Sequence, residues 1–188
     1  MILGLDVSTS RTGWSLVDRK GHLIDQGFVL LQKLPSSYKK ATAVEELLRS
    51  IRAGNKIERI FIEENLQSFR RGFSSARTLS TLARFNGIVS LLSYQVFSIE
   101  PEHVNVNSAR RTLGIKLIKQ KKCGISTKEQ VLAWVRSQVS AHGFDWPIKQ
   151  LKSGPRKGQR IDDPGCYDIA DAYVVARTGA LLVQRGDT

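Results

Sequence analysis

The sequence predicts an α/β fold in which a mixed β-sheet, part antiparallel meander and part parallel strands, carries helices on both faces. The first 32 residues contain three strand-like segments separated by turns, which is typical of a meander. Later segments alternate between short apolar runs and longer runs of helical periodicity, which favours parallel strands joined by helices. With 188 residues, 41% of them hydrophobic and 24% charged, we expect one domain over residues 1–188.

The N-terminal third is predicted to be sheet followed by one helix. Residues 2–7 are a short apolar run that ends in a turn-forming Ser-Thr-Ser cluster, and residues 12–17 are rich in β-formers. A turn at residues 19–21 leads into a third strand at residues 22–32. Apolar residues then recur at helical spacing from 38 to 52, and Gly54 and Asn55 end that helix.

The remaining elements alternate. We expect strands at residues 59–63 and 96–99, helices at 75–92, 104–113 and 167–183, and an exposed basic segment at 116–122. Ser126 and Glu129 have the spacing of a capping box, which predicts a helix reaching about residue 139. Residues 142–165 are rich in Gly, Pro, Lys and Arg without periodicity, and they are predicted to form a long loop.

The charge balance indicates a polyanionic partner. The chain has 29 Lys and Arg against 17 Asp and Glu, a net charge of +12 and a pI of about 10.0. Nucleic acid is favoured over a membrane surface, because no basic helix has a broad apolar face. Two cysteines without a CxxC pair are typical of reduced thiols, and the sequence predicts neither a signal peptide nor a membrane span. We therefore expect a cytoplasmic, nucleic-acid-binding protein.

Four carboxylates lie where a charge is costly. Asp6 and Glu63 each end an apolar strand, and Asp168 and Asp171 share one face of the closing helix. Each has an ordinary explanation alone: a turn cap, a strand end reaching water, or charges complementing a helix dipole. If the two strands are neighbours and the helix crosses them, all four meet and their repulsion calls for cations.

Oxygen ligands without a His or Cys cluster favour magnesium or manganese over zinc. Two such ions in one site activate a water and stabilise the leaving 3′ oxygen of a phosphodiester. The sequence therefore predicts a two-metal nuclease site.

Three segments resemble motifs of the RuvC-type Holliday-junction resolvases, which belong to the RNase H-like superfamily. Residues 4–14, Gly-Leu-Asp-Val-Ser-Thr-Ser-Arg-Thr-Gly-Trp, are similar to the opening motif of that family. Residues 60–64, Ile-Phe-Ile-Glu-Glu, resemble its second acidic strand, and residues 168–172, Asp-Ile-Ala-Asp-Ala, resemble its closing helix. The similarity runs in order from residue 1 to about residue 175, and it is loose between the motifs.

This resemblance implies an RNase H-like fold and a magnesium-dependent endonuclease that cuts four-way DNA junctions as a homodimer. It assigns metal binding and catalysis to four positions, which are Asp6, Glu63, Asp168 and Asp171. Asp6 is the best candidate to bridge two ions, which are Mg²⁺ or, as a substitute, Mn²⁺. Glu64 is left as a neighbour of the site.

The sequence also departs from the bacterial pattern. Val7-Ser8 stands where Pro-Gly is usual, and Leu66 stands where an aromatic residue probes the opened junction. Phe69 and Phe73 are the other candidates for that wedge. The loop before Asp168 is longer and more basic than usual, which would suit a phage or viral member, acting in the host cytoplasm.

The basic residues form three groups along the chain. Some of them are ordinary solvated surface, but their grouping suits phosphate contacts with the arms of a branched DNA. The candidate DNA-binding residues are Arg70, Arg71, Arg77 and Arg84; Arg110, Arg111, Lys116, Lys119, Lys121 and Lys122; and Lys149, Lys152, Arg156, Lys157 and Arg160. The apolar face of the helix at 75–92, which includes Leu91, is either core or, by the resemblance, a dimer contact.

Three alternatives remain at this point. An RNase H-like nuclease could act on flap or other branched DNA, an RNA–DNA hybrid or structured RNA, and a junction-binding protein could lack catalysis, although all four carboxylates are present. Sugar-kinase and actin-like ATPases share a similar opening motif. They need a second domain and a Gly-rich adenosine motif, which we do not find in these 188 residues.

Overall fold

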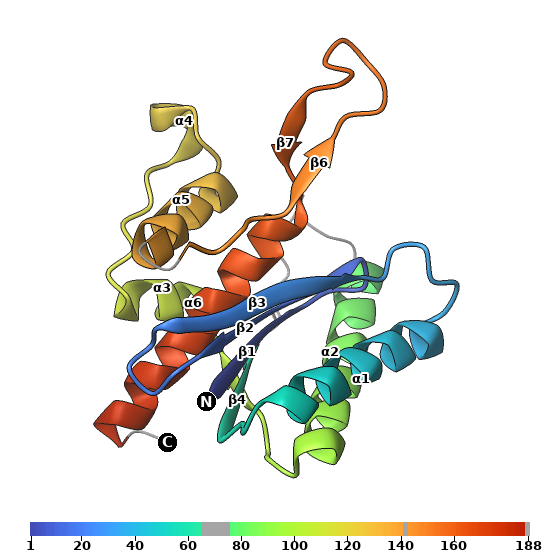
Figure 1. The fold of residues 1–188 in the computed structure, drawn as a ribbon, viewed down its shortest axis with the longest axis vertical. Coiled ribbons are helices and arrows are strands. Elements are labelled where there is room, and N and C mark those ends of the chain that lie inside the picture. Colours follow the sequence, from blue (N-terminus) through green and yellow to red (C-terminus); the bar gives the residue numbers. More distant parts are fainter. Residues whose placement is uncertain (65–75, 141–142, 187–188) are drawn as a thin grey trace.

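The computed structural model describes residues 1–64, 76–140 and 143–186, and its centre is a mixed five-stranded sheet (Figure 1). The strand order is β3-β2-β1-β4-β5, with β1, β2 and β3 antiparallel and with β4 and β5 running parallel to β1. The strands are β1 (Ile2–Val7), β2 (Arg11–Val17), β3 (Leu23–Leu30), β4 (Arg59–Glu63) and β5 (Glu102–Val104). The predicted meander and the predicted mixed sheet are therefore confirmed.

Helices cover both faces of this sheet, as predicted (Figure 1). One face carries α1 and α2, and the other carries α6, against which α3 and α5 pack. The helices are α1 (Ser37–Gly54), α2 (Ala76–Phe97), α3 (Val106–Thr112), α4 (Gln120–Cys123), α5 (Thr127–Val139) and α6 (Gly165–Arg185). The predicted capping box of Ser126 and Glu129 begins α5.

Side-chain alternation in β1 separates two hydrophobic cores. Leu3, Leu5 and Val7 pack into the core shared with α1 and α2, whereas Ile2 packs into the core shared with α6. Gly4 lies on the α6 face as well, because a Cβ on it would be 2.4 Å from the Ala172 carbonyl oxygen. By the same alternation, the side chain of residue 6 faces α6.

Two glycines let α6 lie directly on the sheet. A Cβ on Gly13 would be 2.2 Å from the carbonyl oxygen of Asp168, and one on Gly4 would be 2.7 Å from the Cβ of Ala176. No side chain fits in either place. The close contact brings the first turns of α6 to the end of β1 at which residue 6 lies.

The prediction of a strand at residues 96–99 is wrong. These residues complete and end α2, and Ser98, with a φ of 58°, follows the last helical residue. No helix-breaking residue stands between Leu92 and Phe97, so the helical pattern simply continues. The strand of this region is instead β5, which pairs with β4.

The long loop predicted at residues 142–165 is also wrong in part. It contains a two-stranded antiparallel hairpin, β6 (Ile148–Gln150) and β7 (Arg160–Asp162), which projects from the body of the molecule (Figure 1). Each strand has only three residues, which is too short for a period of two to be recognised in the sequence.

No helix in the described ranges is both long and apolar enough to cross a membrane. The expectation of one domain over residues 1–188 stays a prediction.

Candidate active site

The sheet places Asp6 and Glu63 side by side. β1 and β4 are parallel neighbours in a register that pairs Leu5 with Ile62, so the next position along both strands brings the two carboxylates together. Glu63 faces α6, because Phe61, two residues earlier, packs against Gly179 of that helix. In addition to burial, the charge of Glu63 raises the pKa of Asp6, as expected of neighbouring carboxylates.

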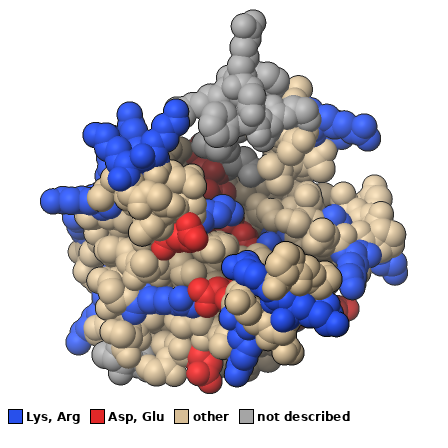
Figure 2. Space-filling model, turned by 90° about the horizontal axis from the view of Figure 1, so that it is seen from above, with Lys and Arg blue, Asp and Glu red and all other residues tan. Residues whose placement is uncertain are grey.

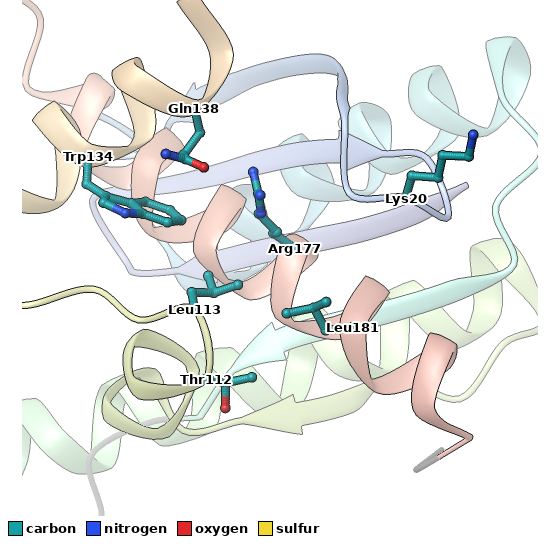
Figure 3. Close-up of a pocket in the computed structure, with 7 residues that line it drawn as sticks. All are labelled: Lys20, Thr112, Leu113, Trp134, Gln138, Arg177 and Leu181. Atoms are coloured by element: carbon teal, nitrogen blue, oxygen red, sulfur yellow. The ribbon is translucent and has the colours of Figure 1, made fainter.

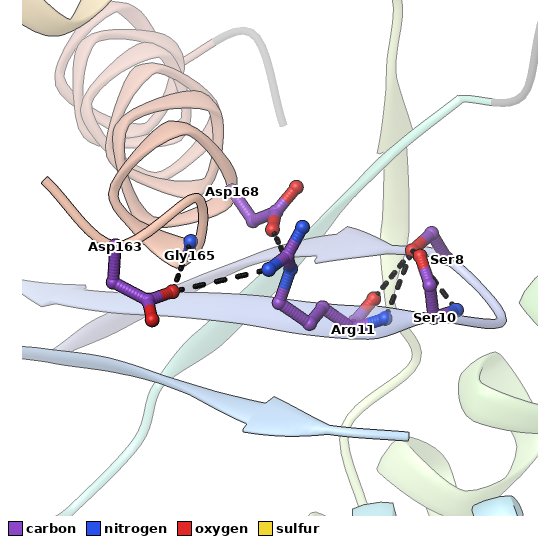
Figure 4. Close-up of polar contacts among 6 residues, drawn as sticks. All are labelled: Ser8, Ser10, Arg11, Asp163, Gly165 and Asp168. Atoms are coloured by element: carbon purple, nitrogen blue, oxygen red, sulfur yellow. Dashed lines mark hydrogen bonds and ion pairs between the residues drawn. The ribbon is translucent and has the colours of Figure 1, made fainter. Parts of the chain in front are cut away.

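The first turns of α6 bring Asp168 and Asp171 to the same place. Both residues are buried, with 9% and 7% of their surface exposed, and both face arginines. Arg11 Nε is 2.7 Å from Asp168 Oδ2, and Arg110 Nη2 donates a hydrogen bond of 2.9 Å to Asp171 Oδ1. Figure 4 shows Arg11 reaching from β2 to the start of α6.

Electrostatics shows that the four carboxylates form one group. Burial raises the pKa of Asp6 well above its usual range, and the charges of Glu63, Asp171 and Asp168 raise it further. Burial and, next, the charge of Asp171 raise the pKa of Glu63 to about 7. Each carboxylate therefore resists ionisation of its neighbours, which is the repulsion expected of an anionic cluster.

Three cations partly offset this repulsion. Arg110 and Lys128 lower the pKa of Glu63, while Arg11 and Lys128 lower that of Asp168, whose pKa burial nevertheless keeps raised. Lys128 lies in the first turn of α5 and also acts on Asp6. The arrangement is an acidic centre with a basic border.

Sequence reasoning missed the roles of Arg11 and Lys128. Arg11 stands inside the opening motif, and Lys128 follows the capping-box serine by two residues, so both lay in segments already singled out. Arg110 was grouped with the DNA-binding residues, whereas its contact in the structure is the carboxylate of Asp171. Contacts between side chains that are far apart in the chain produce no recognisable pattern in the sequence around either residue.

The donor chemistry of the site fits a hard divalent cation, because four carboxylates supply only oxygen ligands. In the present arrangement no three His, Cys, Asp or Glu side chains of the described residues are grouped closely enough to hold an ion. Arg11 and Arg110 contact oxygens of Asp168 and Asp171 that such an ion would need. Metal binding would therefore require the ion pairs of these two arginines with Asp168 and Asp171 to break.

Basic and acidic side chains share one end of the molecule (Figure 2). Figure 2, seen from the end at which the hairpin projects, shows acidic atoms near the middle of this face between groups of Lys and Arg atoms. The exposed candidates are Arg77 and Arg84 on α2; Arg111, Lys116, Lys119, Lys121 and Lys122 in and between α3 and α4; and Lys149, Lys152, Arg156, Lys157 and Arg160 on the hairpin. Leu66, Phe69, Arg70, Arg71 and Phe73 lie outside the described residues.

A separate hollow of about 370 Å³ lies beside the C-terminal half of α6 (Figure 3). Its lining includes Leu113, Trp134 and Arg177, and it contains no acidic side chain. Arg177 is already engaged, because it donates to the Tyr173 hydroxyl at 2.7 Å and lies 5.8 Å from the centre of the Trp134 ring. The carboxylate cluster is the stronger candidate for chemistry.

No family model matches the chain, and no curated protein matches its sequence. Solved structures do share its shape. Thermus thermophilus RuvC in complex with a Holliday junction substrate superposes with a TM-score of 0.65 at 16% identity, covering 98% of this chain and 95% of that one. A second structure of Thermus thermophilus RuvC gives 0.60 at 18% identity, covering 98% and 96%.

The yeast mitochondrial Holliday junction resolvase Ydc2 gives a TM-score of 0.58 at 12% identity, covering 99% of this chain and 82% of that one. At such identities the likeness concerns the fold. The chain has the RNase H-like α/β fold seen in RuvC, as the three sequence motifs predicted.

Proposed function

We propose that this protein is a metal-dependent DNA endonuclease that resolves four-way junctions. The observation that carries the proposal is that Asp6, Glu63, Asp168 and Asp171, which come from three separate elements, lie near one another in a partly buried group. The fold shared with RuvC and the net charge of +12 support a nucleic-acid substrate.

The four carboxylates would hold two Mg²⁺ ions, or Mn²⁺ as a substitute. When bound, the ions would activate the attacking water and stabilise the leaving oxygen. Hydrolysis then adds water to phosphorus and breaks the bond to the 3′ oxygen, which leaves a 5′ phosphate and a 3′ hydroxyl. Asp6 is influenced by the charges of the other three carboxylates, so it would be the central residue among those that hold the ions. Lys128, Arg11 and Arg110 supply positive charge beside the same group.

Four-way junctions have approximate two-fold symmetry, so a symmetric dimer would place one site at each of two strands. Two copies of this chain are therefore part of the proposal. The exposed Leu91 and Tyr94 of α2 are the proposed contact, since large exposed apolar side chains on one helix favour a partner. We place the protein in the cytoplasm, where its DNA substrate is accessible.

Cleavage of a labelled synthetic four-way junction in Mg²⁺ tests this function. Linear duplex, three-way, flap and RNA–DNA hybrid substrates of matched sequence are run beside it. We expect paired symmetric nicks confined to the four-way junction. Preferential cutting of the flap or the hybrid would keep the nuclease and discard the junction as its substrate.

Asp6→Asn is the matched variant for this assay. Removing one charge from the centre of the cluster should abolish cleavage, while junction binding, measured by fluorescence anisotropy, stays within a few-fold. Circular dichroism confirms that the variant is folded. A folded variant that no longer binds DNA would contradict the role assigned to Asp6.

A further inference from the structure

The β6–β7 hairpin is a strongly basic arm. Residues 146–161 contain five Lys and Arg and no Asp or Glu. The five basic residues, all exposed, are Lys149, Lys152, Arg156, Lys157 and Arg160. Positive charge concentrated on a projecting arm suits contact with a polyanion outside the body of the protein (Figure 1).

The arm has a defined shape. Between the two strands, Leu151 N donates to Gln159 O at 2.9 Å, and Gly158 N donates to Leu151 O at 2.8 Å. Gly154 and Gly158 have φ values of 80° and 87°, a conformation that other residues rarely adopt. Backbone hydrogen bonds therefore extend the ribbon beyond β6 and β7 towards its tip.

The root of the arm is fixed to α5. Arg136 donates two hydrogen bonds to Asp162, from Nη1 to Oδ2 at 2.9 Å and from Nη2 to Oδ1 at 2.8 Å. The same guanidinium lies 5.0 Å from the centre of the Trp146 ring, and Asp163 N donates to Pro147 O at 2.9 Å. A bidentate ion pair with an aromatic contact holds an orientation better than a single bond does.

The root is also connected to the carboxylate cluster. Asp163 Oδ1 accepts a hydrogen bond from Gly165 N at 2.8 Å and lies 3.9 Å from Arg11 Nη1. Arg11 in turn pairs with Asp168 at 2.7 Å, as Figure 4 shows. The arm therefore has a fixed position relative to the proposed cleavage site.

We propose that the β6–β7 hairpin lies in the major groove of the DNA duplex next to the cleaved phosphate. Its basic side chains would contact the phosphate backbone of that duplex. This inference rests on the proposed function insofar as it takes DNA as the substrate. The major groove, about 12 Å wide and 8.5 Å deep, admits a two-stranded ribbon. From root to tip the arm has about seven residues, hence at most about 23 Å, which is less than one turn of duplex at about 34 Å.

Duplex is the favoured form of the nucleic acid. Single-stranded DNA is usually bound by aromatic side chains on which bases stack. Residues 147–163 contain no aromatic residue, and Trp146 is engaged by Arg136 at the root. Lysine and arginine without stacking partners suit phosphate contacts along a groove, which position the DNA without reading its sequence.

A shortened arm tests the proposal. In the full chain carrying Asp6→Asn, residues 151–159 are replaced by Asn-Gly, which closes a tight hairpin between Gln150 and Arg160 and leaves the root intact. Hydroxyl-radical footprinting on the four-way junction should lose protection, within one turn of the branch, on the duplex arm next to each of the two cleavage sites. Protection at the branch itself should remain. An unchanged footprint in a folded variant would overturn the proposal.

A charge series provides the matched control. Lys152→Gln, Arg156→Gln and Lys157→Gln are combined and compared with Lys20→Gln, Lys56→Gln and Arg185→Gln, which are exposed and outside the hairpin. The slope of log binding constant against log salt should fall by about 2 to 3 in the hairpin triple variant, because each phosphate contact contributes about 0.9. It should stay unchanged in the control. Equal slopes in the two variants would contradict a hairpin contact with DNA.

A photo-crosslinker at Ser153 locates the tip directly. Crosslinks to the duplex backbone near the branch would support the proposed contact between the arm and DNA. Crosslinks to a second protein chain instead would overturn that proposal. The nicking assay on the wild-type chain is scored separately. If the wild-type chain cuts no substrate but shortening the arm still removes the duplex footprint, the proposed nuclease function is wrong and the proposed DNA contact of the arm is supported. If the wild-type chain nicks the junction but the footprint of the shortened variant is unchanged, the nuclease function is supported and the DNA contact of the arm is wrong.

Discussion

At the scale of single residues, the carboxylates of the proposed site lower the stability of the folded protein. The carboxylates of the cluster repel one another, and burial disfavours the charged forms of Asp6, Glu63 and Asp168. Arg11 and Arg110 compensate by pairing with Asp168 and Asp171. A cluster kept despite such repulsion is typical of functional sites, where natural proteins accept local instability.

Glu63→Gln is expected to stabilise the metal-free protein at high pH. The folded-state pKa of Glu63, about 7, lies above its ordinary value of 4.5, so the folded state binds this proton more tightly than the unfolded state. The wild type should gain stability as pH falls from about 7 to about 4.5 and should bear the full repulsion above pH 7.

Urea unfolding in EDTA at pH 8 and pH 5 measures this difference. At pH 8 the variant should be more stable than the wild type by roughly 1–3 kcal/mol, and the gap should narrow at pH 5. The same variant should lose cleavage. A gap that is equal at both pH values would show that Glu63 is not held in a repulsive cluster.

At the scale of secondary-structure elements, the site depends on how closely α6 approaches β1 and β2. The positions of Asp168 and Asp171 follow from that contact, because both residues lie in the first turns of the helix. Ser15 of β2 also donates a hydrogen bond to Ile169 O at 3.2 Å, next to Asp168. Glycines in the two strands therefore determine the geometry of carboxylates that lie on another element.

Gly13→Ala is expected to displace α6 and impair cleavage. Its Cβ would be 2.2 Å from the Asp168 carbonyl oxygen, which is backbone and must move. A shift of about 1 Å at a catalytic group can lower the rate about 100-fold, and overpacking costs about 1–3 kcal/mol. Thermal unfolding and single-turnover cleavage measure the two effects.

Gly54→Ala, at the exposed end of α1 with nothing within 4 Å of the added methyl, is the control and should leave cleavage unchanged. If Gly13→Ala cleaves as well as the control, the close contact between α6 and β2 does not determine the site.

At the scale of the whole molecule, charge and surface shape point to an assembly on DNA. Acidic atoms lie between groups of Lys and Arg atoms on one end of the molecule (Figure 2). Leu91 and Tyr94, 56% and 53% exposed, lie on α2, which packs on the sheet face opposite to α6. A second copy bound there would leave the carboxylate clusters of both protomers outside the contact.

Leu91→Glu combined with Tyr94→Glu should therefore convert the proposed dimer to monomer. Light scattering measures the mass, and the junction assay should change from paired to single nicks. Ile24→Glu, an exposed apolar residue on β3, is the control. Loss of the dimer in the control alone would place the interface at the edge strand.

The sequence by itself determined the elements that carry the site. Short apolar runs ending in Asp6 and Glu63 identify β1 and β4, and the spacing of Asp168 and Asp171 places both on one helical face. These signals are local, because burial imposes a period on neighbouring residues. Together with the three motifs, these signals predict the fold class and the four candidate carboxylates.

Only the tertiary structure decided which distant groups meet. The parallel pairing of β1 with β4, the contact of Arg110 with Asp171 across 61 residues and the anchoring of the hairpin by Arg136 all join segments far apart in the chain. Such contacts depend on the packing of whole elements and impose no period on the residues nearby. The hairpin was missed for that reason: its strands are short, and long-range contacts hold its root.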